Sequence, residues 1–334
     1  MGKAHLVAED GYFSSFISNG MSSELCFLVF TAMTLAIIFA GVENGIERVS
    51  KIMMPILVVL SLIIAVYSVT RPGALEGVKY FLVPNLDNFS WMTVVSAMGQ
   101  MFYSLSIAMG ILITFGSYMK KDTSIEESTQ NVEIFDTAIA IMAGLMIIPA
   151  VYVFMGRDGM SAGPGLMFIS LPKVFNEMGI AGDIVGLIFF MIVAFAAVTS
   201  SVSIMEAIVS SLIDRFHWSR RKSAILVTVY GLIAEIIVCL GYNKLYMEVK
   251  LPNGTVGQIL DIMDYVSNNV LMPIVALATC ILVGWIVSPK VIIDEVTRGG
   301  SKFTRKGLYI IMVKFIAPAF LLILLLQALG IVTF

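Results

Sequence analysis

The sequence predicts an all-α polytopic membrane protein with about eight transmembrane helices. Of its 334 residues, 58% are hydrophobic and only 13% are charged, whereas soluble proteins average about 25% charged residues. Eight apolar segments are long enough to cross a bilayer core of about 30 Å. The formal net charge of −2 gives no electrostatic reason to expect a nucleic-acid partner. The partner that composition predicts is the lipid bilayer.

Short connections that contain charged residues, glycine or proline separate the eight segments. Each has the length of a membrane helix rather than of a strand. They run near residues 25–42, 52–70, 91–119, 134–156, 184–213, 223–241, 265–289 and 307–331.

The lysines and arginines of the connections predict the orientation, because cytoplasmic loops carry an excess of both. Thirteen lie on the side that includes residues 215–222 and 290–306, and seven lie on the other. The first side is therefore cytoplasmic, which places Met1 outside. The first 20 residues contain no apolar signal segment. Either an odd number of spans precedes this chain, or the short tail crosses unaided.

The connection at 157–183 is too interrupted to span a membrane. Its apolar content predicts a re-entrant or capping loop packed on the outer face. The alternative is an interfacial helix lying on the lipid surface.

Residues 91–119 form the longest uncharged segment, with Gln100, Tyr103, Ser104 and Ser106 near its centre. A long span with polar residues and glycine at mid-membrane predicts a discontinuous helix, which exposes backbone carbonyls at the midplane. A tilted, continuous helix with a polar packing face is the alternative.

A run of hydroxyl side chains interrupts the next-but-one span, over residues 194–205. Thr199, Ser200 and Ser201 are consecutive. Because successive helix residues point about 100° apart, no single helix interface can use all three. Some of these hydroxyls are expected to face a cavity, which at this depth suggests a transport site.

Four ionisable side chains fall within predicted spans. An intramembrane carboxylate is costly and is a functional candidate by default. Asp136 opens the fourth span, and Glu206, directly after the hydroxyl run, is expected to be buried and either protonated or paired. Glu235 can be buried or interfacial, and Lys314 is expected to extend toward the surface.

Four short stretches, in order along the chain, resemble the neurotransmitter:sodium symporter family, bacterial amino-acid branch. They are Gly41–Arg48 with Ser50–Pro55, Gly99–Ser106, Gly163–Gly165 and Val198–Ser201. The resemblance covers essentially all 334 residues. It implies a LeuT-type inverted-repeat fold in which the family's first three helices are absent from this chain.

On this resemblance, residues 1–334 form one transmembrane transporter domain. Residues 1–72 would hold the last two spans of the first repeat, residues 91–289 the second five-helix repeat, and residues 305–334 an additional carboxyl-terminal span.

The resemblance also implies two sodium sites, at which sodium is co-transported. Ala196, Thr199 and Ser200 match one half of the second site, where a carbonyl and two hydroxyls supply hard oxygen ligands. Ser104 and Asp136 match ligands of the first site, where the family often has Asn in place of Asp.

Substrate and gate positions are carried over in the same way. Tyr103 and Asp264 match the outer gate, and Asp214 matches the inner gate. Met109 is flexible where some relatives have Phe, so the pocket can adapt to bulky apolar side chains. The substrate pocket would be lined by Tyr103, Ser106, Ile107, Met109, Ser200 and Ile204.

The implied function is sodium-coupled symport of an amino acid across the bacterial plasma (inner) membrane by alternating access. No enzyme activity and no organic cofactor are expected, because no nucleophile–base pair, metal cluster or phosphate loop is recognisable. With half of each ion site, this polypeptide alone is expected not to transport. The alternatives are a non-transporting fragment of a broken gene and one subunit of a split transporter, with the missing helices supplied in trans.

Overall fold

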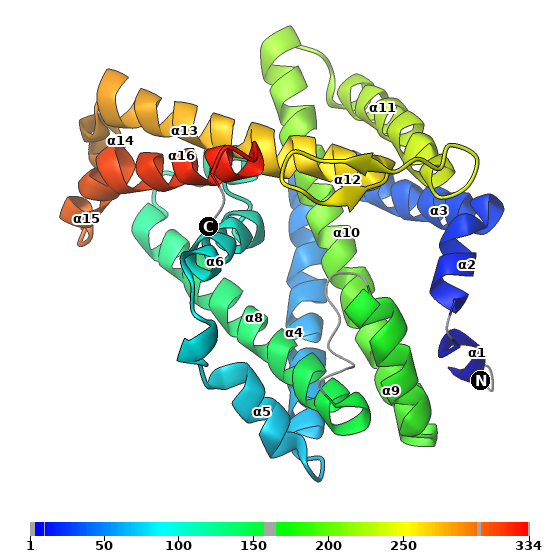
Figure 1. Ribbon diagram of the computed structural model, residues 1–334. Helices are drawn as coiled ribbons and strands as arrows, with labels where there is room; N and C mark the ends of the chain where they lie inside the picture. Colours follow the sequence, from blue (N-terminus) through cyan, green and yellow to red (C-terminus); the bar gives the residue numbers. More distant parts are fainter. Residues whose placement is uncertain (1–3, 10, 157–164, 299–301, 333–334) are drawn as a thin grey trace. The chain divides into compact units, whose positions relative to one another are not determined.

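The computed structural model describes residues 4–9, 11–156, 165–298 and 302–332 (Figure 1). Its first half contains α1 (Ala4–Val7), α2 (Tyr12–Ser18), α3 (Gly20–Phe39), α4 (Arg48–Val69), α5 (Ala74–Leu82), α6 (Trp91–Ser104), α7 (Ile111–Ser117) and α8 (Ile125–Met155). Its second half contains α9 (Leu171–Glu177), α10 (Ile180–Phe216), α11 (Arg220–Gly241), α12 (Ile259–Asp264), α13 (Met272–Ile281), α14 (Pro289–Val296), α15 (Lys306–Ile311) and α16 (Ala317–Ala328).

Several of these helices are joined into longer ones by π-helical turns, in which one extra residue widens the helix. The turns are η1 (Val42–Glu47), η4 (Leu166–Ser170), η5 (Tyr265–Leu271), η6 (Leu282–Ile286) and η8 (Met312–Ile316), and a 3₁₀ turn, η2, covers Leu86–Asn88.

In the described part of the chain, seven helices are long and apolar enough to cross a membrane. They are Gly20–Phe39, Val42–Val69, Ile125–Met155, Ile180–Phe216, Arg220–Gly241, Ile259–Ile286 and Lys306–Ala328. These correspond to seven of the eight predicted segments and confirm the all-α membrane class.

The remaining predicted span, 91–119, is not one helix but two short ones, α6 and α7. Between them Ser106 and Ala108 have φ values of +53° and +64°, and Gly110 has +76°. A right-handed helix cannot continue through such left-handed backbone. The discontinuous helix is therefore confirmed, and a continuous tilted helix is wrong.

Helix α8 begins well before the predicted boundary, at Ile125 instead of residue 134. Glu126 and Glu127 occupy its first turn, where negative charge is favourable. Asp136 therefore lies more than two turns inside the helix, and an end-of-helix position for this carboxylate is excluded.

Residues 157–164 of the predicted capping loop, including Gly163 and Pro164, lie outside the described residues. The rest of the loop forms η4 and α9, whose side chains Leu171, Val174 and Phe175 are buried in protein. A helix lying on the lipid surface is therefore wrong for this part of the loop, and a packed loop is confirmed.

The first of two compact units comprises Met1–Leu86, Thr137–Met205 and Ser211–Asn243. Its core joins α4, α8, α9 and α10 through buried apolar side chains that include Leu57, Val151, Val174 and Phe189. Helices α3 and α11 lie side by side in this unit (Figure 1).

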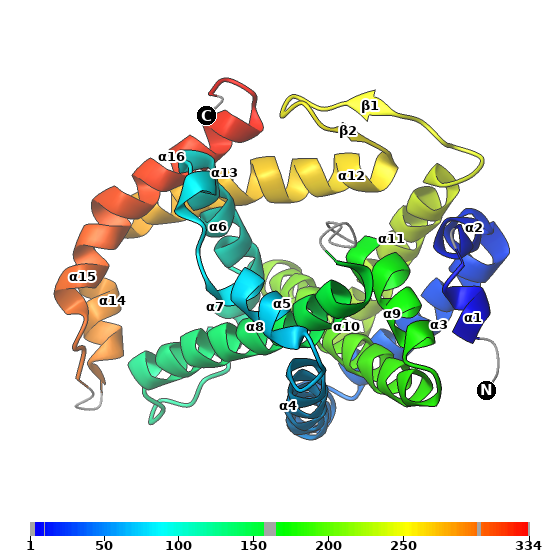
Figure 2. The same ribbon diagram turned by 60° about the horizontal axis from the view of Figure 1, so that its bottom comes forward.

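The second compact unit comprises Asp87–Asp136, Glu206–Ser210 and Lys244–Phe334. Helices α13 and α16 run alongside each other in it (Figure 2). The Tyr265 hydroxyl donates to the Ala328 carbonyl at 2.7 Å and ties η5 to the end of α16. Strands β1 (Val249–Lys250) and β2 (Val256–Gly257) pair antiparallel ahead of α12.

Candidate ion and substrate site

The end of α6 combines two features that attract a cation. Ser104 is the last residue of α6, where the helix carbonyls carry partial negative charge. Its Oγ donates a hydrogen bond of 2.5 Å to Asp136 Oδ1 of α8. The break after Ser104 thus places a hydroxyl, a carboxylate and a helix carboxyl terminus at one point of the second unit.

Helix α10 carries the second set of candidate sodium ligands. The Thr199 hydroxyl is buried and lies 3.0 Å from both the Phe195 and the Ala196 carbonyl oxygens. Two of the three expected ligands, Ala196 and Thr199, are therefore adjacent, while the Ser200 side chain points to an exposed face.

The neighbouring hydroxyls of α10 have other partners. Ser201 Oγ lies 3.2 Å from Thr34 Oγ1 of α3, and Ser203 Oγ donates to the Thr199 carbonyl at 2.9 Å. As expected from helix geometry, the run does not serve a single interface.

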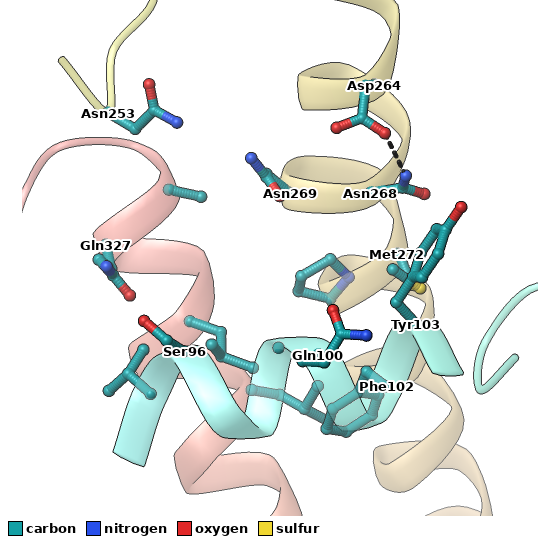
Figure 3. A pocket seen from close by; sticks show the side chains of 16 residues that line it. Ser96, Gln100, Phe102, Tyr103, Asn253, Asp264, Asn268, Asn269, Met272 and Gln327 are labelled. Atoms are coloured by element: carbon teal, nitrogen blue, oxygen red, sulfur yellow. Dashed lines mark hydrogen bonds between the residues drawn. The ribbon is translucent and has the colours of Figure 1, made fainter. Parts of the chain in front are cut away.

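A pocket of about 410 Å³ lies in the second unit between α6, η5 and α16 (Figure 3). Asp264 is the only charged side chain among its lining residues, and its Oδ1 accepts from Asn268 Nδ2 at 2.6 Å. The polar lining consists of Ser96, Gln100, Tyr103, Asn253, Asp264, Asn268, Asn269 and Gln327. A single carboxylate surrounded by amides favours a ligand group that is cationic or that offers several hydrogen bonds.

Among the residues of this pocket, the sequence pattern points to Gln100, Tyr103 and Asp264 but not to the other amide side chains. Asn268 and Asn269 follow Asp264 by one helical turn in an otherwise apolar span, and that spacing could have identified them. Nothing local marks Asn253, which lies on the β1–β2 connection, or Gln327 of α16.

The remaining predicted substrate and gate residues are divided between the two units. Ser106, Ile107 and Met109 lie on the unwound segment between α6 and α7, in the second unit. Ser200 and Ile204 lie on α10 in the first unit. Asp214 is an exposed residue near the carboxyl end of α10, also in the first unit.

Both remaining intramembrane glutamates are hydrogen-bonded. Glu206 is fully buried, and its Oε1 accepts from the Tyr118 hydroxyl at 2.7 Å. This confirms the expected buried and paired carboxylate. Glu235 of α11 is half-buried and accepts from Thr31 Oγ1 of α3 at 3.0 Å.

Comparison with known proteins identifies the family. The Sodium:neurotransmitter symporter family matches residues 14–333 of this chain. The chain belongs to this family. The broken helix with Ser104 at its end and the hydroxyl run of α10 are thus features of a transporter of that family, and family and fold are those of a transporter rather than an enzyme.

Relatives of this symporter family member are named as sodium-dependent transporters. An uncharacterised one of Bacillus subtilis, YhdH, is 33% identical over 329 residues, which cover 96% of this chain and 70% of the relative. Another, of Methanocaldococcus jannaschii, is 32% identical over 257 residues, covering 75% of this chain and half of the relative. The sodium-dependent nutrient amino acid transporter 1 of Drosophila grimshawi is 24% identical and is covered over 42% of its length.

Among solved structures, the crystal structure of MhsT in complex with L-phenylalanine superposes with a TM-score of 0.82 at 34% identity. The match covers 95% of this chain and 70% of MhsT. The chain therefore has the fold of this symporter family, and it is a multi-pass membrane protein.

Proposed function

We propose that the protein to which these residues belong couples sodium entry to uptake of an amino acid across the bacterial plasma membrane. The observation that carries this proposal is the break in the span 91–119. It ends α6 at Ser104, whose hydroxyl is bonded to Asp136. A carboxylate beside a helix carboxyl terminus suits a sodium ion, which prefers hard oxygen ligands.

Two sodium sites are proposed, each with ligands from residues already named. Ser104 and Asp136 supply two oxygens to one. The carbonyl of Ala196 and the hydroxyls of Thr199 and Ser200 supply three to the other. Each proposed site needs further oxygen ligands. We propose that the substrate and other parts of the transporter supply them.

The proposed substrate is an amino acid with a large apolar side chain. The crystal structure of MhsT holds L-phenylalanine, and a relative in Drosophila is named as an amino acid transporter. Ser106, Ile107, Met109, Ser200 and Ile204 are proposed to line its site. Tyr103, Asp264 and Asp214 are proposed as gates that close around it during alternating access.

The test is uptake of radiolabelled L-phenylalanine by proteoliposomes under an inward sodium gradient. Protein purified from its native membrane is expected to accumulate phenylalanine with sodium and not with an equal potassium gradient. Absence of sodium-dependent uptake for all large apolar amino acids would overturn the proposal.

A further inference from the structure

Lys314 is an intramembrane cation that the transport sites do not use. It lies eight residues beyond Lys306, the first residue of α15, which is about 12 Å along the helix axis. An ammonium group at this depth is costly unless it is paired or reaches the surface. None of the ion pairs among the described residues includes Lys314.

Trp285 holds the Lys314 side chain in place. The Lys314 Nζ lies 5.6 Å from the centre of the indole ring, and the indole Nε1 donates to the Lys314 carbonyl at 3.2 Å. The ring also packs edge-on against Phe315, with centroids 5.6 Å apart. Tryptophan rings concentrate at membrane–water interfaces, and Trp285 lies one residue before the end of the long apolar helix Ile259–Ile286. We therefore expect this pairing where headgroups meet acyl chains.

The backbone brings these two side chains together through facing π-helical turns. Trp285 lies on η6 and Lys314 on η8. Gly284 permits their approach, because a Cβ there would lie 3.3 Å from the Val313 carbonyl and 3.5 Å from Lys314 Cα. Single π-helical turns within α-helices are frequent at functional sites.

The surroundings combine further cations with an apolar face. Lys290 and Lys306, at the same cytoplasmic ends, are exposed and take part in none of the ion pairs of the described residues. Ile286 is 72% exposed and Ile311 52% exposed, so the outer face beside Lys314 is apolar. Positive charge at headgroup level above an apolar face is complementary to one anionic headgroup and its acyl chains.

We propose that Lys314 and Trp285 form a site for an anionic phospholipid of the cytoplasmic leaflet. The phosphate oxygens pair with the Lys314 ammonium, which the indole ring positions. The acyl chains lie along the face that carries Ile286 and Ile311. This site is independent of the sodium and substrate sites.

The test uses the fluorescence of Trp285. The sequence has three tryptophans, so the double variant Trp91→Phe/Trp218→Phe leaves Trp285 as the reporter. This variant of the full chain is reconstituted into vesicles that contain acyl-brominated phosphatidylglycerol or acyl-brominated phosphatidylcholine. Brominated phosphatidylglycerol is expected to quench the Trp285 fluorescence at a mole fraction about fivefold lower than brominated phosphatidylcholine does. This is the preference expected for one lysine near an anionic lipid.

Three further variants make the assignment specific. In the same background, Lys314→Met is expected to abolish the preference for phosphatidylglycerol over phosphatidylcholine, and Lys314→Arg is expected to keep it. Lys121→Met is the matched control, because Lys121 is another exposed lysine predicted to be cytoplasmic, and it is expected to keep the preference. Equal quenching by both lipids, or a preference that survives Lys314→Met, would overturn the proposal. If Lys314→Met does not fold, the Trp91→Phe/Trp218→Phe variant provides the test. Its preference for phosphatidylglycerol must be present at low salt and must disappear at high salt.

Discussion

At the scale of single residues, the proposed ion sites consist of a few polar groups placed at the ends and in the middle of membrane helices. Asp136 is the clearest case, because its carboxylate lies inside α8 and accepts from Ser104 at 2.5 Å. A carboxylate attracts sodium more strongly than an amide oxygen does, since it carries a full negative charge.

Asp136→Asn is accordingly expected to raise the half-saturating sodium concentration for uptake about tenfold, or about 1.4 kcal/mol of binding free energy. Sodium titration of uptake by the purified protein in proteoliposomes measures this. Asp122→Asn, which alters an exposed carboxylate in the α7–α8 connection, is the control and should leave the sodium dependence unchanged. Equal sodium dependence of Asp136→Asn and the parent would remove Asp136 from the ion site.

Glu206 shows a second residue-scale effect, the stabilisation of a buried carboxylate by a hydroxyl donor. The Tyr118 hydroxyl donates to it at 2.7 Å, and Glu206 is fully buried. Tyr118→Phe is expected to lower the free energy of unfolding by about 1–3 kcal/mol, because a hydrogen bond to a buried polar group is lost.

Thermal unfolding of the purified protein in detergent measures this loss. Tyr230→Phe is the matched control, because Tyr230 is 73% exposed, and it should melt like the parent. If both variants melted together, the Tyr118–Glu206 hydrogen bond would have no stabilising role.

At the scale of elements, the interruption between α6 and α7 is the feature on which the proposed sodium site at Ser104 and Asp136 depends. Gly110 adopts φ +76° there, and a Cβ at this position would meet nothing closer than 4.0 Å. Space is therefore available, and the constraint is the backbone conformation itself.

Gly110→Ala is expected to destabilise the protein by about 1–2 kcal/mol, the cost of left-handed backbone for a residue with a Cβ. Gly116→Ala within α7, where a Cβ meets nothing within 4 Å, is expected to stabilise by up to about 1 kcal/mol. Melting temperatures of the two variants should therefore move in opposite directions. A parallel shift would show that residue 110 does not require left-handed backbone in the membrane-embedded protein.

At the scale of the whole molecule, the long apolar helices and the distribution of basic residues together predict one orientation in the membrane. The α10–α11 connection, which Arg215, Arg220, Arg221 and Lys222 flank, is expected in the cytoplasm, and the β1–β2 hairpin is expected outside.

Single cysteines in a background without Cys26, Cys239 and Cys280 test this orientation. A membrane-impermeant maleimide added to intact cells should label Thr255→Cys in the hairpin and should label Ser219→Cys only after the cells are opened. The reverse pattern would invert the orientation and would place Lys314 in the outer leaflet.

The sequence by itself determined the membrane class, the positions of seven long helices, the break near Gly110 and the family. These properties depend on the length of apolar segments, on helix periodicity and on the order of short motifs, all of which can be identified in the sequence itself. The sequence also identified Ser104, Asp136 and the hydroxyl run as candidate ion-site residues, because polar groups are rare in membrane spans and each one is therefore informative.

Only the tertiary structure decided which side chains meet. The pairing of Tyr118 with Glu206 joins residues 88 positions apart, and the packing of Trp285 on Lys314 joins residues 29 positions apart. The polar pocket gathers side chains of α6, η5, α16 and the hairpin, and α8 begins nine residues before its predicted start. Such contacts depend on how the helices pack, and a sequence pattern of period 3.6 gives the face of a helix without naming its neighbour.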